Sequence, residues 1–136
     1  MTRFVIYTDD IKNIQELEQL LRKAVLARKE WPLVQTYAGE ENFPAYLQFV
    51  RQNPYLIMVA VATGLEGRRK AMRIREINWE ARMLWFSDKS NEAAADSIGI
   101  TAFGLLPVSM EVVESALDAC NVCSDASDAA DVRAFV

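Results

Sequence analysis

Short apolar runs alternate along the chain with segments in which apolar residues recur at helical spacing. The apolar runs predict strands over residues 3–8, 31–37, 55–61, 83–86 and 100–106. The spaced segments predict helices over residues 14–25, 41–52, 68–78, 89–97 and 110–119. Residues 55–61, YLIMVAV, are apolar on both faces, which is typical of a central strand in a sheet covered on both sides.

Each predicted strand is followed by a predicted helix, and this alternation defines the fold class. Right-handed crossovers place helices on both faces of a parallel sheet, so we expect a three-layer α/β sandwich. Its topology should be flavodoxin-like, (βα)5, with strand order 2-1-3-4-5. One domain should span residues 1–121. Residues 122–136 are rich in Asp, Ser and Ala and predict a polar acidic tail or linker.

The composition and charge of the chain argue against several classes of function. The net charge of −4 and the pI of about 4.9 argue against direct binding to nucleic acid, which usually needs a basic surface. Histidine is absent, and with it the commonest general base and neutral metal ligand. The longest apolar run, residues 56–62, is too short to span a bilayer, and no signal sequence is visible. We therefore expect a cytoplasmic protein without a membrane partner.

The two cysteines, Cys120 and Cys123, form a single C-x-x-C motif at the carboxyl end of the last predicted helix. A structural zinc site needs about four ligands, and a redox pair normally begins a helix. We interpret both cysteines as ordinary helix and tail residues without chemistry.

The candidate chemistry lies where the predicted strands end, because ligand sites in open parallel sheets collect at the carboxyl edge. The residues predicted there are Asp9 and Asp10, residues 60–63, Ser87 and Asp88, and Leu106-Pro107.

The order and spacing of these pieces resemble the response-regulator receiver domains of two-component signalling, over roughly residues 3–119. Asp9-Asp10 resembles the acidic pair of the family, residues 55–61 the strand leading to the phosphoacceptor, and residues 65–67 the Gly-containing loop after it. Ser87 matches the family's Ser/Thr. Residues 99–107, GITAFGLLP, match the closing motif and place Phe103 at the aromatic switch position.

The resemblance implies what each position would do in an active receiver. The acidic pair would hold Mg²⁺, and an Asp at the end of the third strand would accept the phosphoryl group. The Ser/Thr and a Lys just before a Pro would bind the phosphoryl oxygens.

Two departures from the family pattern remove that chemistry. The phosphoacceptor position carries Ala60, which has no nucleophilic atom, and the lysine position carries Leu106, which cannot neutralise a phosphoryl oxygen. Two neighbouring acids alone would hold Mg²⁺ only weakly, so we expect at most a vestigial metal site, no cofactor and no enzymatic activity. The degenerate phosphorylation pocket implied by the resemblance comprises Asp9, Asp10, Ala60, Ser87, Leu106 and Pro107.

The retained residues also have structural interpretations. Asp9 and Asp10 can form a turn and a helix N-cap, and Ser87 can satisfy a backbone group at a strand end. Phe103 is either plain core or a side chain that faces a partner.

The third predicted helix and its flank are basic. We interpret this segment as a solvated face, with a docking patch for an acidic partner as the alternative. The basic residues are Arg68, Arg69, Lys70, Arg73, Arg75 and Arg82, against Glu76 and Glu80.

The resemblance therefore implies a pseudo-receiver: a phosphorylation-independent signalling module that acts by protein–protein interaction. It would be the N-terminal regulatory part of a transcriptional response regulator. The family's usual interface predicts contact with a protein partner, or with a second copy in a homodimer, through the last two helices and the fifth strand. That surface lies near residues 93–96, Phe103 and residues 111–114.

Two other functions stay open at this point. One is an unorthodox phosphoreceiver that uses Asp9 or Asp10 as the acceptor. The other is a small-ligand or flavin-binding protein of the same architecture, although no Gly-rich phosphate loop follows the first predicted strand and its acids would repel phosphate.

Overall fold

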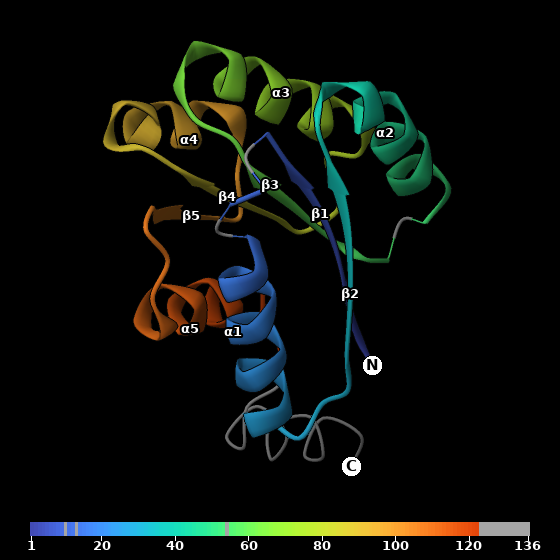
Figure 1. Cartoon of the computed structure of the whole chain (residues 1–136), viewed down its shortest axis with the longest axis vertical. Helices are drawn as coiled ribbons and strands as arrows, with labels where there is room; N and C mark the ends of the chain where they lie inside the picture. Colours follow the sequence, from blue (N-terminus) through green and yellow to red (C-terminus); the bar gives the residue numbers. More distant parts are fainter. Residues whose placement is uncertain (10, 13, 54, 123–136) are drawn as a thin grey trace.

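A computed structural model describes residues 1–9, 11–12, 14–53 and 55–122. Its five strands form one parallel sheet in the order β2-β1-β3-β4-β5, which confirms the predicted three-layer topology. Helices α1 and α5 cover one face of the sheet, and α2, α3 and α4 cover the other (Figure 1). The strands are β1 (Thr2–Thr8), β2 (Pro32–Ala38), β3 (Ile57–Val61), β4 (Met83–Ser87) and β5 (Ala102–Leu105). The helices are α1 (Ile14–Ala27), α2 (Phe43–Gln52), α3 (Gly64–Ile77), α4 (Glu92–Ile98) and α5 (Met110–Ala119), with short 3-10 turns η1 (Glu40–Asn42) and η2 (Lys89–Asn91).

The sheet separates two apolar cores, because successive side chains on a strand point to opposite faces. On β1, Phe4 and Ile6 pack toward α1 and α5, whereas Val5 and Tyr7 pack toward α2 and α3. All four are fully buried. The continuous apolar character of the central strands follows from this burial on both faces.

Helix α3 begins earlier than the sequence predicts. Residues 64–67, expected to form a loop, are its first turn, and the Gly67 amide donates to the Thr63 carbonyl at 2.9 Å. Gly64 begins the helix in the left-handed region, with φ +69°. At Gly67 the helix lies directly against the end of β3, where a Cβ atom would lie 2.5 Å from the carbonyl oxygen of Ala62. The two glycines thus let a helix start where larger residues would favour a loop.

Helix α5 is tied to the end of α1 by Arg28, whose side chain is 8% exposed. Its guanidinium donates to the carboxylates of Glu114 at 2.6 Å and Asp118 at 2.8 Å, and to the Val122 carbonyl at 3.0 Å. Val122, which we assigned to the tail, is itself buried in the core between these helices. The ordered core therefore extends one residue past the predicted boundary.

The rest of the predicted tail, residues 123–136, lies outside the described residues, as does Cys123. Within the part of the chain that the structure describes, no helix combines the length and the apolar character needed to cross a membrane.

Replacing Gly67 with alanine should destabilise the fold. The new Cβ would collide with backbone at the end of β3, which cannot rotate away, so we expect a loss of about 1–3 kcal/mol in the free energy of unfolding. Urea-induced unfolding would measure it. Ser97→Ala, at an exposed position of α4, is the control and should change stability by less than about 0.5 kcal/mol. A stability loss at Gly67 no larger than this would contradict the close contact.

Candidate functional site

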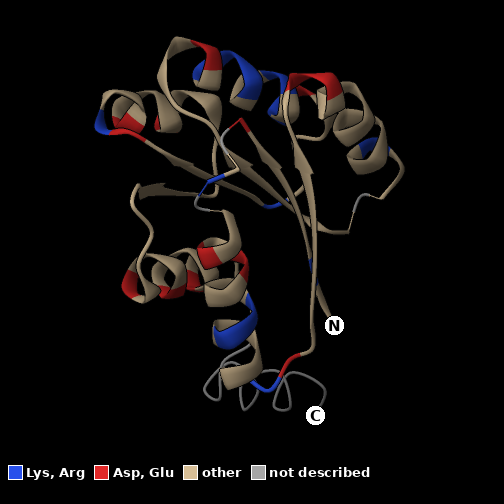
Figure 2. Ribbon diagram, in the orientation of Figure 1, with Lys and Arg blue, Asp and Glu red and all other residues tan. Residues whose placement is uncertain are grey.

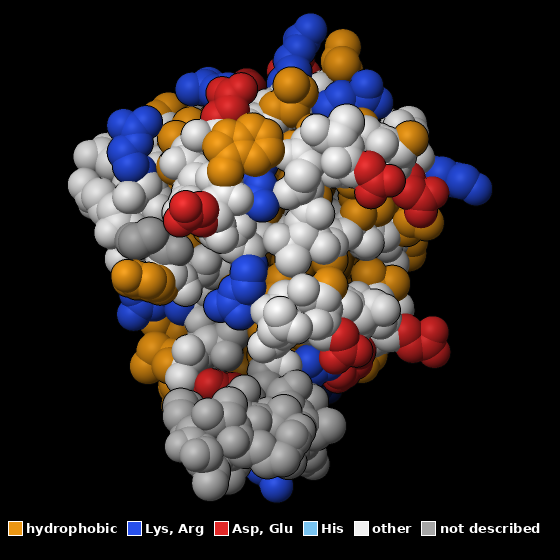
Figure 3. All heavy atoms as spheres, turned by 180° about the vertical axis from the view of Figure 1, so that it is seen from behind, with side chains coloured by type: hydrophobic (Ala, Val, Ile, Leu, Met, Phe, Trp, Pro, Cys, Tyr) orange, Lys and Arg blue, Asp and Glu red, His pale blue; other side chains and the backbone are white. Residues whose placement is uncertain are grey.

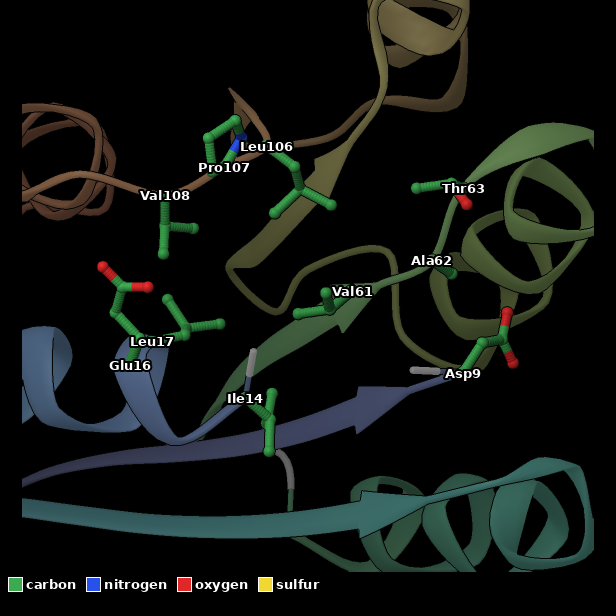
Figure 4. Close-up of a pocket in the computed structure, with 10 residues that line it drawn as sticks. All are labelled: Asp9, Ile14, Glu16, Leu17, Val61, Ala62, Thr63, Leu106, Pro107 and Val108. Atoms are coloured by element: carbon green, nitrogen blue, oxygen red, sulfur yellow. The ribbon is translucent and has the colours of Figure 1, made fainter. Parts of the chain in front are cut away.

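A cavity of about 160 Å³ opens at the carboxyl edge of the sheet (Figure 4). Its walls come from the start of α1, the end of β3 and the connection between β5 and α5, and most of the lining is apolar. The lining residues are Asp9, Ile14, Glu16, Leu17, Val61, Ala62, Thr63, Leu106, Pro107 and Val108. The structure thus brings together three of the predicted site residues, Asp9, Leu106 and Pro107. Asp10, also predicted here, lies outside the described residues.

Ala60 lies outside this cavity, so the expectation that it lines the edge is wrong. It pairs with Tyr7 and Trp85 in the sheet and is fully buried in the core under α2, α3 and α4. The next residue, Val61, is the one that reaches the cavity. The physical reason is the two-residue period of a strand, in which a one-residue shift moves a side chain to the other face. Valine, like alanine, has no nucleophilic atom.

Leu106 presents an aliphatic side chain to the cavity, as the sequence predicts (Figure 4). Its amide donates to the Ser87 carbonyl at 3.0 Å, which continues the pairing of β4 with β5 beyond the end of the strand. The Leu106–Pro107 peptide bond is cis. No positive charge is available from this position to bind an anion.

Ser87 does not line the cavity either. Its side chain is fully buried, and its hydroxyl accepts from the Asn91 amide at 3.0 Å. The Asn91 amide also donates to the Gly64 carbonyl at 3.0 Å, while the Asn91 oxygen accepts from Arg68 at 2.9 Å. The hydroxyl is therefore part of a network that fixes the start of α3 to the loop after β4.

Asp88 completes this network. Its carboxylate accepts from the Ser90 hydroxyl at 2.6 Å and from the Gly64 amide at 3.1 Å. The hydrogen bond from Ser90 is the largest of the effects that lower the pKa of Asp88. The acid at this strand end thus acts as a structural acceptor.

Asp9 is held by two side chains from its own side of the sheet. One oxygen of its carboxylate accepts from the Lys70 ammonium at 2.8 Å and from the Tyr7 hydroxyl at 2.7 Å. The Lys70 side chain is 9% exposed and also lies 3.1 Å from the Glu40 carboxylate. Its ammonium stands 5.5 Å from the centre of the Tyr7 ring. Asp9 therefore has a built-in counter-cation from α3.

The protonation states of this cluster follow from burial and from the ion pairs. Burial opposes the charged form of Lys70, but the hydrogen bonds to Asp9 and Glu40 outweigh it and raise the pKa of Lys70. Burial, reinforced by the hydrogen bond to Asp9, raises the pKa of Tyr7 to about 12. At neutral pH Lys70 is therefore a charged ammonium and Tyr7 a neutral phenol.

The described residues do not fit a magnesium site. Mg²⁺ needs near-octahedral oxygen ligation. One carboxylate oxygen of Asp9 already accepts hydrogen bonds from Lys70 and Tyr7. Among the described residues, no group of three acidic, cysteine or histidine side chains lies close enough to hold a metal ion.

The solvated-face interpretation of α3 is wrong for two of its basic residues. Lys70 and Arg75 are buried, with 8% and 7% of their surface exposed. Arg75 donates to the carbonyls of Ala81 and Asn78, and its guanidinium lies over the Trp79 ring at 5.7 Å. Basic and acidic positions are mixed along the ribbon of α3 (Figure 2). These two cations have internal structural roles.

Phe103 lies at the surface edge of the sheet. Its ring packs edge-on against Trp85, with centroids 5.5 Å apart, and one side of it remains partly exposed. Cys120 is buried, and burial raises the pKa of its thiol to about 11. A thiol with so high a pKa is almost entirely protonated at neutral pH, which disfavours nucleophilic chemistry.

No protein-family model matches the chain, and no curated protein matches it in sequence. Solved structures match it in fold. A response regulator receiver domain protein from Clostridium thermocellum has a TM-score of 0.66 and 18% identity, over 89% of this chain and 95% of that one. A pilus assembly-related protein from Burkholderia pseudomallei has a TM-score of 0.65 and 13% identity, over 92% and 93%. A DNA-binding response regulator of the LuxR family from Staphylococcus aureus has a TM-score of 0.58 and 14% identity, over 89% and 97%. The chain has the flavodoxin-like fold of receiver domains.

Three residues that organise this edge are not predicted as site residues from the sequence, namely Tyr7, Lys70 and Asn91. Lys70 lies within a run of basic residues and does not stand out there. One signal was present, because Lys70, Ala71 and Ile74 share the helix face that packs on the sheet, and a lysine there must meet a carboxylate.

A double-mutant cycle should show that Lys70 and Asp9 are strongly coupled. Because the ammonium of Lys70 is shielded from water although Asp9 is partly exposed, Lys70→Met and Asp9→Asn should give a coupling energy of about 1 kcal/mol or more in urea unfolding. The exposed pair between Arg69 and Glu66 is the matched control, and the same cycle there should give about 0.5 kcal/mol or less. Equal coupling in the two cycles would mean that Lys70 does not anchor Asp9.

Tyr7 should make the fold sensitive to alkali. Because the pKa of Tyr7 rises from 10.0 to about 12 on folding, its stabilising contribution is complete below pH 10 and is lost as pH rises to 12. Between pH 10 and pH 12 this loss should lower the unfolding free energy of the parent chain by about 2–3 kcal/mol, and Tyr7→Phe should abolish that part of the decrease. Tyr55→Phe, at a side chain that is 93% exposed, is the control. Identical pH profiles for the two variants would contradict the prediction.

Proposed function

We propose that this chain is a phosphorylation-independent, receiver-like signalling module that acts by binding a protein rather than by catalysis. The observation that carries the proposal is the composition of the edge cavity. Val61 and Leu106 line it where an active receiver would need a nucleophile and a cation, and Asp9 is already paired with Lys70. Phosphoryl transfer to a side chain needs a nucleophile, and neither Val61 nor Leu106 offers one at these positions.

The proposed contact surface consists of α4, β5 and α5, with Phe103 at its centre. Its occupant is a partner protein or a second copy of the chain. Without a phosphoryl switch, the balance between conformers of this surface is set by the sequence itself, or by a ligand that prefers one conformer.

The proposed setting is the N-terminal regulatory part of a transcriptional response regulator. A structural neighbour is a DNA-binding response regulator, which supports this setting at the level of fold. Because other neighbours are pilus assembly proteins, the fold is compatible with more than one kind of output.

Phosphodonors should have no effect on the chain. We expect acetyl phosphate with Mg²⁺ to add no mass, and beryllofluoride with Mg²⁺ to leave the amide resonances of residues 57–63 and 102–108 unchanged. An active receiver in the same buffer is the positive control. A mass increase that hydroxylamine removes would show an acyl phosphate and end the proposal. Loss of that label in Asp9→Asn would identify the unorthodox phosphoreceiver instead.

A further inference from the structure

The surface formed by α4, β5 and α5 has a single sign of charge. Residues 90–119, which include all three elements, contain no lysine or arginine. The ribbon of α5 carries acidic positions and no basic ones (Figure 2). The acidic residues of this stretch are Glu92, Asp96, Glu111, Glu114 and Asp118.

These acids divide into two groups. Glu114 and Asp118 are neutralised within the chain by Arg28. Glu92, Asp96 and Glu111 are exposed, and within the described residues they form no ion pair. Three carboxylates of this surface are therefore available to a cationic partner.

A shallow groove of about 360 Å³ lies between the acidic helices. Gly104 forms part of its floor, where β5 approaches α5 so closely that a Cβ would lie 2.6 Å from a methyl of Val112. Phe103 is partly exposed in the groove and Leu105 is 38% exposed. Glu92 and Glu111 line it from the α4 side and the α5 side. Seen from behind, acidic side chains gather over both helices, with hydrophobic side chains between them (Figure 3).

We propose that this surface binds a cationic amphipathic segment of a partner protein. An apolar side chain of that segment would fill the groove beside Phe103 and Leu105, and its lysine or arginine side chains would pair with Glu92 and Glu111. The inference rests on the proposed function and specifies the chemistry of its partner.

A second copy of the chain fits this surface poorly. A two-fold symmetric contact brings the same patch of each copy together, so carboxylates would face carboxylates. A head-to-tail contact would need cations from elsewhere on the chain. Exposed cations do lie elsewhere, such as Arg22 and Lys23 on α1, so self-association is left as an outcome of the test below. Repulsion between like charges disfavours the two-fold dimer, and the exposed carboxylates of this surface fit a separate basic partner.

A model peptide tests the inference directly. The probe is a blocked peptide of about three helical turns with lysine and leucine at helical spacing. Titration into the 15N-labelled chain should shift the amide resonances of α4, β5 and α5. The dissociation constant should rise with salt, because exposed ion pairs are screened. A peptide with glutamate in place of lysine should not bind.

Two matched variants separate a specific surface from general attraction to an acidic protein. Glu92→Gln with Glu111→Gln should weaken binding about fivefold or more. Glu76→Gln with Glu80→Gln removes the same charge from exposed positions on α3 and in the loop that follows it, and should leave the affinity unchanged. Equal weakening in both variants, resonance shifts confined to α3, or concentration-dependent self-association through α4 and α5 would each overturn the inference.

This test can fail separately from the proposed function. If the peptide does not bind and phosphodonors still leave the chain unlabelled, only the chemistry assigned to the partner is wrong. If phosphodonors label the chain, the proposed function fails whatever the peptide does.

Discussion

The ammonium of Lys70 places a positive charge from α3 against the carboxylate of Asp9, and the arrangement of the whole edge depends on this contact. The ammonium is largely shielded from water. The Asp9 oxygen that it contacts also accepts a hydrogen bond from the Tyr7 hydroxyl. Removing Asp9 would leave the ammonium of Lys70, whose side chain is 9% exposed, with only the exposed carboxylate of Glu40 as an ionic partner. The contact therefore fixes the position of α3 relative to the end of β1.

With that acid already neutralised, the rest of the edge needs no further charge. Val61 and Leu106 line the cavity with aliphatic groups. The hydroxyl of Ser87 lies outside the cavity lining and accepts a hydrogen bond from the Asn91 amide. An anion entering here would lose its hydration and gain no ionic partner from the cavity wall. The side chains of Asp9, Ser87 and Asp88 are used to hold α3 and the loop after β4 in place.

The sequence was most informative where periodicity is strong. Alternating strand and helix patterns predicted the strand order and the extents of most elements, and the two-sided apolar run placed β3 at the centre. Which side chain of β3 faces the cavity was harder to predict, because Ala60 and Val61 are both small and apolar. Only the sheet register shows that it is Val61. The pairing of Lys70 with Asp9 spans 61 positions in the sequence and depends on how α3 crosses the sheet, so no local pattern indicates it.

The ion pairs of Arg28 limit how α5 can move against α1. Sliding α5 along α1 would pull the carboxylates of Glu114 and Asp118 away from a guanidinium that has little access to water. Such a displacement carries a large electrostatic penalty, so α5 is poorly suited to move as a lever. Any conformational change of the proposed contact surface would then have to come from α4 or β5, and not from α5.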